Sequence, residues 1–471
     1  MKENWYDKFN KKSSISDARN RRKEFNKERN TYFEEKRKKS AEKNTFVAEP
    51  DDSSKAPFQK PDGTIIKNEH LFSFSSLPQD AVAVLNNFDS IVQNVRPLNS
   101  RQILKLPKDI RALSHQLTDE RNIRRVGYMN AAEELSAYVR YFSWWNLVRF
   151  TRIFANLPPE SFCLKDGDAC LDIGSGPLTV VTALWLSRPE LRNKKLTFYC
   201  VDLSQSALSL GENLYLSVAA KTPPSDKNAD MHWNIIKIKG SAGIFIKQKV
   251  SFISCANMFN ELRETAESRP DELAEAQAKK LLSYTDENAS IFIAEPGMPV
   301  AAHFVSLMRD NLIKNNVSIL SPCPHTDKCP MNGLHARFGG SAKWCNFSFT
   351  TEDAPQKLLK LSKDAGIPKE RAVVTFLMAR KEKASAAPKA SATKRNTSDF
   401  TNTLPLRIAS DLIRLPEKRC GFYACSQVGI VLAVNTTHKK LASGDKIEVS
   451  LHKSADSLPK DKKSGAIEIN V

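Results

Sequence analysis

The chain has 471 residues and carries 71 Lys and Arg against 53 Asp and Glu, which gives a formal net charge of +18. At about 150 residues per domain we expect two or three domains, and 41% apolar residues exclude a wholly disordered chain. No apolar run reaches the roughly 18 residues of a transmembrane helix, and the first residues lack the apolar segment of a secretory signal. The basic charge favours nucleic acid or an anionic surface over acidic proteins as the partner.

We therefore expect an intracellular protein with no membrane association and no stable oligomer. A bacterial-type cytoplasm is the favoured compartment, because the N-terminal residues include acidic side chains that transit peptides avoid; the mitochondrial matrix is the alternative. Nine cysteines in a reducing compartment do not predict a disulfide framework, so cysteines that cluster in the sequence are metal or redox candidates.

The N-terminal third is divided by composition into three segments. Residues 1–48 form a basic arm: the first 44 residues hold fifteen Lys or Arg and eight Asp or Glu, typical of a segment that binds phosphates or of a solvated tail. Residues 49–74 are rich in Pro, Asp and Ser and are interpreted as a linker. Apolar residues at helical spacing over 75–157 predict a helical lead-in domain.

Residues 158–380 are predicted to form an α/β domain. Seven short apolar runs alternate here with amphipathic segments over 178–188, 205–220, 267–283 and 299–315. The runs are CLDIG, LTFYCVDL, WNIIKIKG, VSFISCANMF, SIFIAEPG, VSILS and AVVTFLMAR. Buried strands separated by helices predict a doubly wound, parallel, Rossmann-like sheet. A low-complexity linker over 381–400 and a small β-rich tail domain over 401–471 follow.

The first apolar run ends in a candidate nucleotide-binding turn. Asp172, Gly174 and Gly176 lie between a strand and a helical segment, where glycines allow a tight turn close to a ligand. The second run ends at Asp202, whose carboxylate is placed to accept the hydroxyls of a ribose. The alternative is a degenerate fold that is retained only as a scaffold.

These residues resemble the class I S-adenosylmethionine (SAM)-dependent methyltransferases, and the resemblance implies that Asp172, Gly174, Gly176 and Asp202 bind SAM. Leu178 stands where that family has a small residue. After the fourth run, NMFNEL replaces the Asn/Asp-Pro-Pro-Tyr/Phe motif of amino-methylating relatives. Catalytic residues are therefore not assigned; Asn260 and Glu261, expected to face the cleft at the sheet edge, are the candidates.

Three cysteines form the strongest candidate metal site. Cys323, Cys329 and Cys345 lie within one Pro-containing stretch, 321–348, and thiolates select zinc or iron–sulfur clusters. A fourth thiolate would come from the tail, from Cys420 or Cys425, and sequence spacing does not separate zinc from a cluster. The remaining cysteines lie in or beside buried strands and are interpreted as core residues.

Together these motifs resemble the methyltransferase-like assembly factors of the small ribosomal subunit. The matching segments, between about residues 75 and 450, are LPKDIRALSHQLTDER, YMNAAEELSAYVRYFSWWN, LDIGSGPLT, NMFNEL, AEPG, CPH…CP…WCNFS and RLPEKRCGFYACSQVG. The resemblance implies a [4Fe–4S] cluster on Cys323, Cys329, Cys345 and Cys425, and binding to small-subunit rRNA during assembly. The alternatives are an active SAM-dependent rRNA methyltransferase and a structural, zinc-containing RNA-binding protein.

Overall fold

A computed structural model describes residues 61–118, 128–259, 269–333, 343–381, 403–436, 439–462 and 464–471. The chain divides into two compact units, Met1–Pro57 and Phe58–Val471, and every described residue belongs to the second. The predicted basic arm, and all but the first residue of the predicted linker over 381–400, lie outside the described residues.

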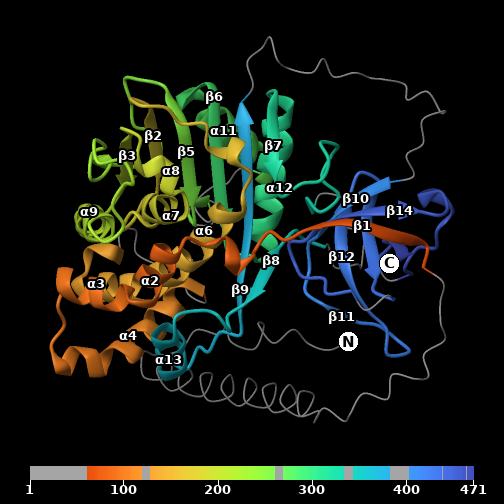
Figure 1. Cartoon of the computed structure of the whole chain (residues 1–471), viewed down its shortest axis with the longest axis horizontal. Coiled ribbons are helices and arrows are strands. Elements are labelled where there is room, and N and C mark those ends of the chain that lie inside the picture. Colours follow the sequence, from red (N-terminus) through yellow and green to blue (C-terminus); the bar gives the residue numbers. More distant parts are fainter. Residues whose placement is uncertain are drawn as a thin grey trace, which may run out of the picture. The chain divides into compact units, whose positions relative to one another are not determined.

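The lead-in segment is helical, as its apolar spacing predicts (Figure 1). Its helices are α2 (Gln79–Asn86), α3 (Phe88–Val95), α4 (Ser100–Thr118), α5 (Ala132–Ala137), the π-helical turn Tyr138–Ser143 and α6 (Trp144–Asn156). Trp144, Leu147, Phe150 and Phe154 of α6 are buried and belong to the same hydrophobic core as the next helix of the chain. The lead-in helices are thus continuous with the α/β core.

The α/β domain is built on an eight-stranded sheet in the order β4-β3-β2-β5-β6-β9-β7, with β8 paired to β9. Its strands are β2 (Ala169–Ile173), β3 (Thr197–Asp202), β4 (Asn234–Lys239), β5 (Val250–Ala256), β6 (Thr285–Glu295), β7 (Val317–Ser321), β8 (Phe347–Thr350) and β9 (Arg371–Lys381). The Rossmann-like α/β class predicted from the sequence is confirmed. The sheet is mixed rather than wholly parallel, because β9 runs antiparallel to β6, β7 and β8.

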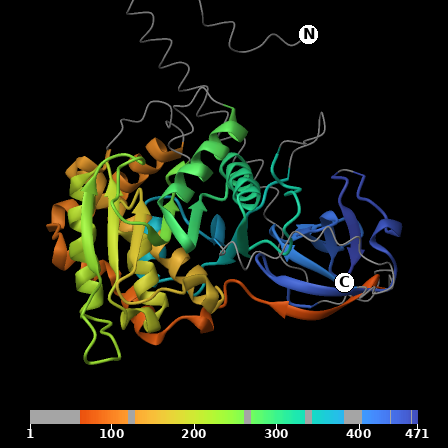
Figure 2. The same ribbon diagram turned by 90° about the horizontal axis from the view of Figure 1, so that it is seen from above.

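Helices cover both faces of this sheet (Figure 2). Alternate residues of β2 illustrate the two faces: Cys170 belongs to the core shared with α6, α7 (Thr179–Ser187) and α9 (Gln205–Ala219). Leu171 belongs to the core shared with α11 (Pro270–Tyr284) and α12 (Pro299–Lys314). The four helices lie within a few residues of the predicted segments, since amphipathic periodicity fixes where a helix can bury an apolar face.

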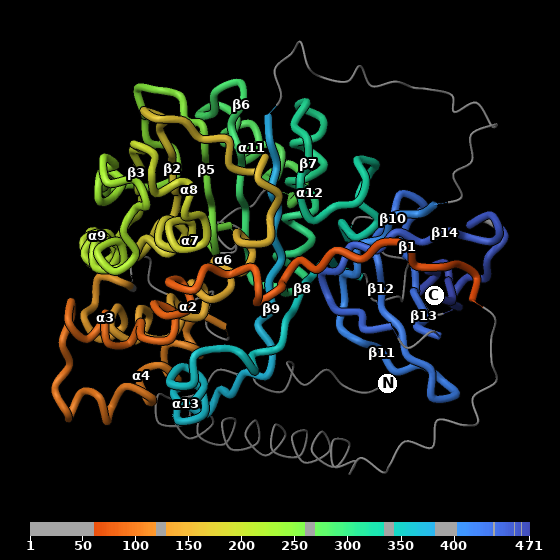
Figure 3. Tube along the Cα trace, viewed as in Figure 1, coloured from red at the N-terminus to blue at the C-terminus, as the bar shows by residue number. Residues whose placement is uncertain are grey.

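The tail forms a second, seven-stranded sheet, as the β-rich pattern predicts. Its strands are β10 (Thr403–Ile408), β11 (Ile413–Arg414), β12 (Cys420–Ser426), β13 (Gly429–Val434), β14 (Lys446–Leu451) and β15 (Ile467–Asn470), joined by β1 (Gly63–Glu69). β1 pairs antiparallel with β14, so the trace in Figure 3 brings an early segment beside a late one. The predicted linker over 49–74 therefore contains a strand that its polar composition concealed.

One buried carboxylate holds this edge of the tail sheet together. Asp445 is 1% exposed; its Oδ1 lies 2.8 Å from Nδ1 of His70, and its Oδ2 accepts hydrogen bonds from Asn68 Nδ2 at 3.4 Å and from the Ala442 amide at 2.9 Å. Both His70 and Asn68 lie at the end of β1. Asp445 thus connects the early strand to the turn before β14.

We expect Asp445→Ala to lower the free energy of unfolding by about 1–3 kcal/mol, because it leaves buried donors without an acceptor. Urea denaturation followed by circular dichroism checks this value. Asp364→Ala, at an exposed position on the last turn of α13 (Gln356–Asp364), is the matched control and should change little. Equal stabilities of the two variants would contradict the role of Asp445.

Candidate functional site

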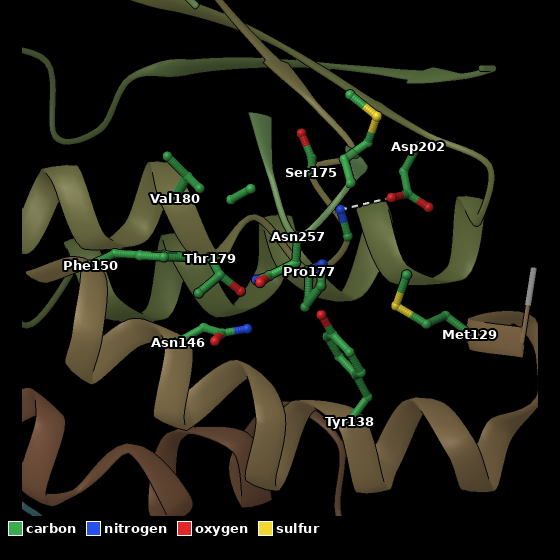
Figure 4. Close-up of a pocket in the computed structure, with 14 residues that line it drawn as sticks. Met129, Tyr138, Asn146, Phe150, Ser175, Pro177, Thr179, Val180, Asp202 and Asn257 are labelled. Atoms are coloured by element: carbon green, nitrogen blue, oxygen red, sulfur yellow. Dashed lines mark hydrogen bonds between the residues drawn. The ribbon is translucent and has the colours of Figure 1, made fainter. Parts of the chain in front are cut away.

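The Gly-rich turn after β2 forms the floor of a pocket (Figure 4). Gly174 and Gly176 have φ values of +73° and +50°, a conformation that side chains disfavour, and the amide of Gly174 donates to the carbonyl of Val201 at 2.8 Å. Leu178 also adopts a left-handed conformation, with φ of +54°, directly before α7. That conformation costs a non-glycine residue about 1–2 kcal/mol, and complete burial of the Leu178 side chain offsets the cost.

Asp202, at the end of β3, lies in the same pocket and fastens the turn. Its Oδ2 accepts a hydrogen bond from the Gly176 amide at 2.9 Å, drawn as a dashed line in Figure 4, and its Oδ1 accepts from Ser204 at 2.8 Å. Burial raises the pKa of Asp202, while these backbone hydrogen bonds oppose the rise. Of the predicted cofactor residues, the structure brings Gly174, Gly176 and Asp202 together around one pocket.

Asp172 is not among the residues that line the pocket. It is 1% exposed and accepts a hydrogen bond from Ser254 Oγ at 2.6 Å, while its Oδ2 has no hydrogen-bond partner in the described part of the chain. Burial raises the pKa of this carboxyl from 3.8 to about 6. The Asp172 side chain is therefore bonded to the neighbouring strand β5 rather than exposed to the pocket.

Helix α9 approaches the turn closely because residue 211 is a glycine. A Cβ atom at Gly211 would lie 2.4 Å from the carbonyl carbon of Pro177 and 2.8 Å from a methyl group of Leu178. Any side chain at this position would push the helix away from the turn. Gly211 is a structural determinant of the pocket that the sequence motifs did not reveal, since it lies within an ordinary helical pattern.

The candidate catalytic residues Asn260 and Glu261 lie outside the described residues, so their prediction is untested. Just before them, Asn257 has φ of +56° and lines the pocket. Glu295, at the end of β6, accepts hydrogen bonds from the amides of Met258 at 3.0 Å and Phe259 at 2.8 Å. This carboxylate thus shapes the segment that follows β5.

The four predicted metal ligands all line a second cavity. Cys323, Cys329 and Cys345 come from the loop between β7 and β8, and Cys425 comes from β12 of the tail sheet. Cys420, the competing fourth candidate, lies on the same strand but does not line the cavity. Burial is the leading cause that raises the pKa of all four thiols, that of Cys329 to about 11.

Two buried arginines face this cavity, and the sequence motifs did not point to either. Arg309, on α12, is 2% exposed; its Nε donates to Cys323 Sγ at 3.1 Å and its Nη2 to the His325 carbonyl at 2.7 Å. Arg407, on β10, donates through Nε to the Pro322 carbonyl at 2.6 Å. The thiols therefore lie beside two positive charges at the border of the hydrophobic core.

Neighbouring polar side chains order the cysteine loop. Asp310 accepts hydrogen bonds from Arg309 Nη1 at 2.6 Å and from the Cys329 amide at 3.2 Å. Nε2 of His325 lies 3.2 Å from Cys425 Sγ, which links the loop to the tail sheet. Within the described ranges, no group of three or more His, Cys, Asp or Glu side chains is arranged so that it could hold a metal ion.

Comparison with known proteins gives one family. The sequence model of the family described as mitochondrial small ribosomal subunit Rsm22 matches residues 166–421. No curated protein matches the chain. No helix in the described segments is long and apolar enough to cross a membrane.

Solved structures similar to this chain include methyltransferases. A putative methyltransferase from Thermoplasma acidophilum is 12% identical, with 47% of this chain and 71% of that chain covered and a TM-score of 0.26. A putative class I SAM-dependent methyltransferase from Listeria monocytogenes is 12% identical, with 66% and 90% covered and a TM-score of 0.28. The plantazolicin methyltransferase BpumL, in complex with SAH, is 12% identical, with 65% and 99% covered and a TM-score of 0.27.

The buried Asp172 predicts a pH dependence of stability. Its pKa is higher in the folded chain than the ordinary 3.8, so its contribution to the free energy of unfolding falls as pH rises from about 4 to about 6. Relative to wild type, the free energy of unfolding of Asp172→Asn should therefore rise by about 2–2.5 kcal/mol between pH 4 and pH 7, whatever constant offset the amide introduces. Urea denaturation across this pH range measures the change. The surface variant Asp364→Asn should show no such trend; an identical trend would contradict the assignment to Asp172.

Proposed function

The chain belongs to the mitochondrial small ribosomal subunit Rsm22 family, and from this we propose that it binds small-subunit rRNA as an assembly factor. The proposal further includes a bound iron–sulfur cluster and a methyltransferase fold that retains its SAM pocket. The observation that carries it is the cavity that the four cysteines share, because three of them lie in the segment that the family match covers and the fourth lies just beyond it on β12. The family description also supports the mitochondrial matrix, the second of the two compartments expected from the sequence.

The pocket beside the Gly-rich turn supports SAM as a ligand. The first residues of α7, Thr179 and Val180, line the pocket, the first N–H groups of a helix have no partner within it, and Asp202 stands at the end of the neighbouring strand. In this arrangement the carboxylate of Asp202 would hold the ribose hydroxyls, and Gly176 would let the backbone approach the ligand closely. Asp172 would not contact SAM, and would affect its binding only through the position of the Gly-rich turn.

The chemistry of the cysteine cavity fits an iron–sulfur cluster. Four thiolates around a cluster are an excess of negative charge, which Arg309 and Arg407 in the cavity lining would balance. When bound, the cluster would supply a covalent link between the cysteine loop and the tail sheet. The cavity is small, about 20 Å³, so the cysteine loop would have to rearrange around a cluster; a single zinc ion is the alternative.

An active rRNA methyltransferase is the second candidate function. It is favoured by a larger cavity of about 230 Å³ that adjoins the SAM pocket and shares Asn257 with it. A methyl acceptor would have to lie on this side of the cofactor. The catalytic residues are unassigned, and for this reason we place assembly before catalysis.

The cluster proposal is tested with two cysteines of one strand. After anaerobic purification, wild type should contain iron and the absorption of an iron–sulfur cluster, and Cys425→Ser should lose both and show a lower melting temperature. Cys420→Ser is the matched control and should keep the metal, because Cys420 does not line the cavity. Metal analysis and visible spectroscopy are the measurements.

Loss of metal in Cys420→Ser but not in Cys425→Ser would reassign the fourth ligand. Stoichiometric zinc without iron would overturn the cluster and support the zinc alternative. Neither metal in the wild-type protein would remove the metal site from the proposal.

The rRNA proposal predicts that the full chain sediments with small-subunit precursor particles. Its affinity for a small-subunit rRNA fragment should fall steeply with salt, with a slope of about 0.7 for each phosphate neutralised in a single strand. Deleting residues 1–45, which hold a large excess of Lys and Arg, should lower both affinity and slope. Filter binding at several salt concentrations measures them, and salt-independent binding, or identical binding without the arm, would contradict the electrostatic account.

A further inference from the structure

The larger cavity beside the SAM pocket is lined by residues of the lead-in helices and by residues of the α/β domain. It has a volume of about 230 Å³ and shares Tyr138, Asn146, Phe150 and Asn257 with the SAM pocket. Figure 4 shows Tyr138 and Asn146 rising from the lead-in helices toward the shared boundary. A ligand in this cavity would therefore lie next to the cofactor.

Two cationic side chains line the cavity without an acidic partner. Arg149, on α6, donates through Nη1 to Asn146 Oδ1 at 2.7 Å, and its Nε is buried without a hydrogen-bond partner in the described part of the chain. Lys369, just before β9, places its Nζ 5.7 Å from the centroid of the Trp145 ring. Among the described residues, neither cation forms an ion pair with a carboxylate, and both are only partly exposed.

Burial makes the charged form of both side chains less favourable, and the charge of Arg149 adds to this effect at Lys369. Burial lowers the pKa of Arg149 to about 10. Burial, and secondly the charge of Arg149, lower the pKa of Lys369 to about 8. Charges removed from water need a partner, and two neighbouring cations without one indicate a place where an anion binds.

The rest of the lining combines aliphatic, polar and aromatic residues with one carboxylate, that of Glu295, which accepts the hydrogen bonds of the Met258 and Phe259 amides. Tyr138 and Phe142 stack on each other with centroids 5.8 Å apart, and Tyr141 and Trp145 also line the cavity. Aromatic walls beside cationic groups are typical of sites that take an unstacked nucleotide, since every base offers a face for stacking and its phosphate pairs with the cations. The net charge of +18 favours RNA over an acidic peptide as the source of such an anion.

We infer that this cavity binds a single nucleotide of RNA, with its phosphate between Arg149 and Lys369 and its base against the aromatic walls. The RNA partner rests on the proposed function; the two cations and the cavity do not. The inference adds a recognition site for one nucleotide at the edge of the SAM pocket. Arg149 and Lys369 act here as binding residues.

The test uses the full chain and nucleoside 5′-monophosphates as probes, with the corresponding nucleosides for comparison. Calorimetry should show that wild type binds monophosphates more tightly than nucleosides. In Lys369→Met and Arg149→Met the affinity for monophosphates should fall about ten- to a hundredfold, the loss expected for one charged hydrogen bond, while nucleoside affinity stays similar. Lys363→Met, at an exposed position on α13, is the matched control and should bind as wild type does.

Melting temperatures of the variants separate a loss of binding from a loss of folding. Removing an unpaired, partly buried charge should leave the melting temperature equal or higher, so lost binding at an unchanged melting temperature supports the site. A variant that melts much earlier is replaced by Lys369→Gln or Arg149→Gln, which keep polar atoms in the cavity, and these should show the same loss.

Three results would overturn the inference. If wild type and both variants bind monophosphates with equal affinity, Arg149 and Lys369 do not contribute to binding. Weaker binding of SAH, with unchanged monophosphate binding, would assign the cations to the carboxylate of the cofactor. Inorganic phosphate or an acidic peptide binding as tightly as the monophosphates would remove nucleotide recognition. If monophosphates bind as expected but the chain does not sediment with small-subunit precursors, the proposed function fails while the site stands.

Discussion

The antiparallel pairing of β9 is the constraint on which both cavities depend. This single strand pairs with β6, β7 and β8, and the cysteine loop leaves the sheet at Ser321 and returns at Phe347, both opposite β9. Val373 and Val374 line the larger cavity, whereas the next three residues, Thr375, Phe376 and Leu377, line the cysteine cavity. The backbone hydrogen bonds of β9 therefore set the distance between the two cavities.

This arrangement makes the two cavities neighbours across one strand rather than independent sites. A change in the cysteine loop that shifts β9 along its own axis would move Val373 and Val374 as well. The backbone hydrogen bonds to three strands oppose such a shift, because breaking them exposes buried donors and acceptors. If the proposed metal binds, we therefore expect it to affect the larger cavity mainly by holding β9 in place.

The sequence predicted the elements well where a repeating pattern of apolar residues demanded them. The strands that end at Ile173 and Asp202 and the helices that follow them are in place, since burial on both faces leaves a continuous apolar run. The direction of β9 was missed, because an apolar run is the same in either direction. The strand β1 was missed because its sequence, GTIIKNE, is mostly polar and exposed, and only pairing with β14 defines it.

The candidate sites show a similar division. The family resemblance favoured Cys425, but sequence spacing alone left Cys420 as a competing fourth ligand. An odd spacing within one strand places the two on opposite faces, and Cys425 is on the face that lines the cavity. Asp172 follows the sequence motif and is nevertheless outside the pocket lining. Arg149, Arg309 and Lys369 had no local signal at all, because an arginine or lysine in a helix or loop is usually solvated and only tertiary packing removes it from water.

The position of β1 affects the order in which the chain can fold as it is synthesised. Asn68 and its partner Asp445 are 377 residues apart, a distance that a ribosome covers in roughly 20–75 s at about 5–20 residues per second. During this interval β1 has no partner strand, while the α/β sheet can already close. The wall of the cysteine cavity that Cys425 contributes is then among the last to form, so this cavity is complete only after synthesis has passed the tail strands.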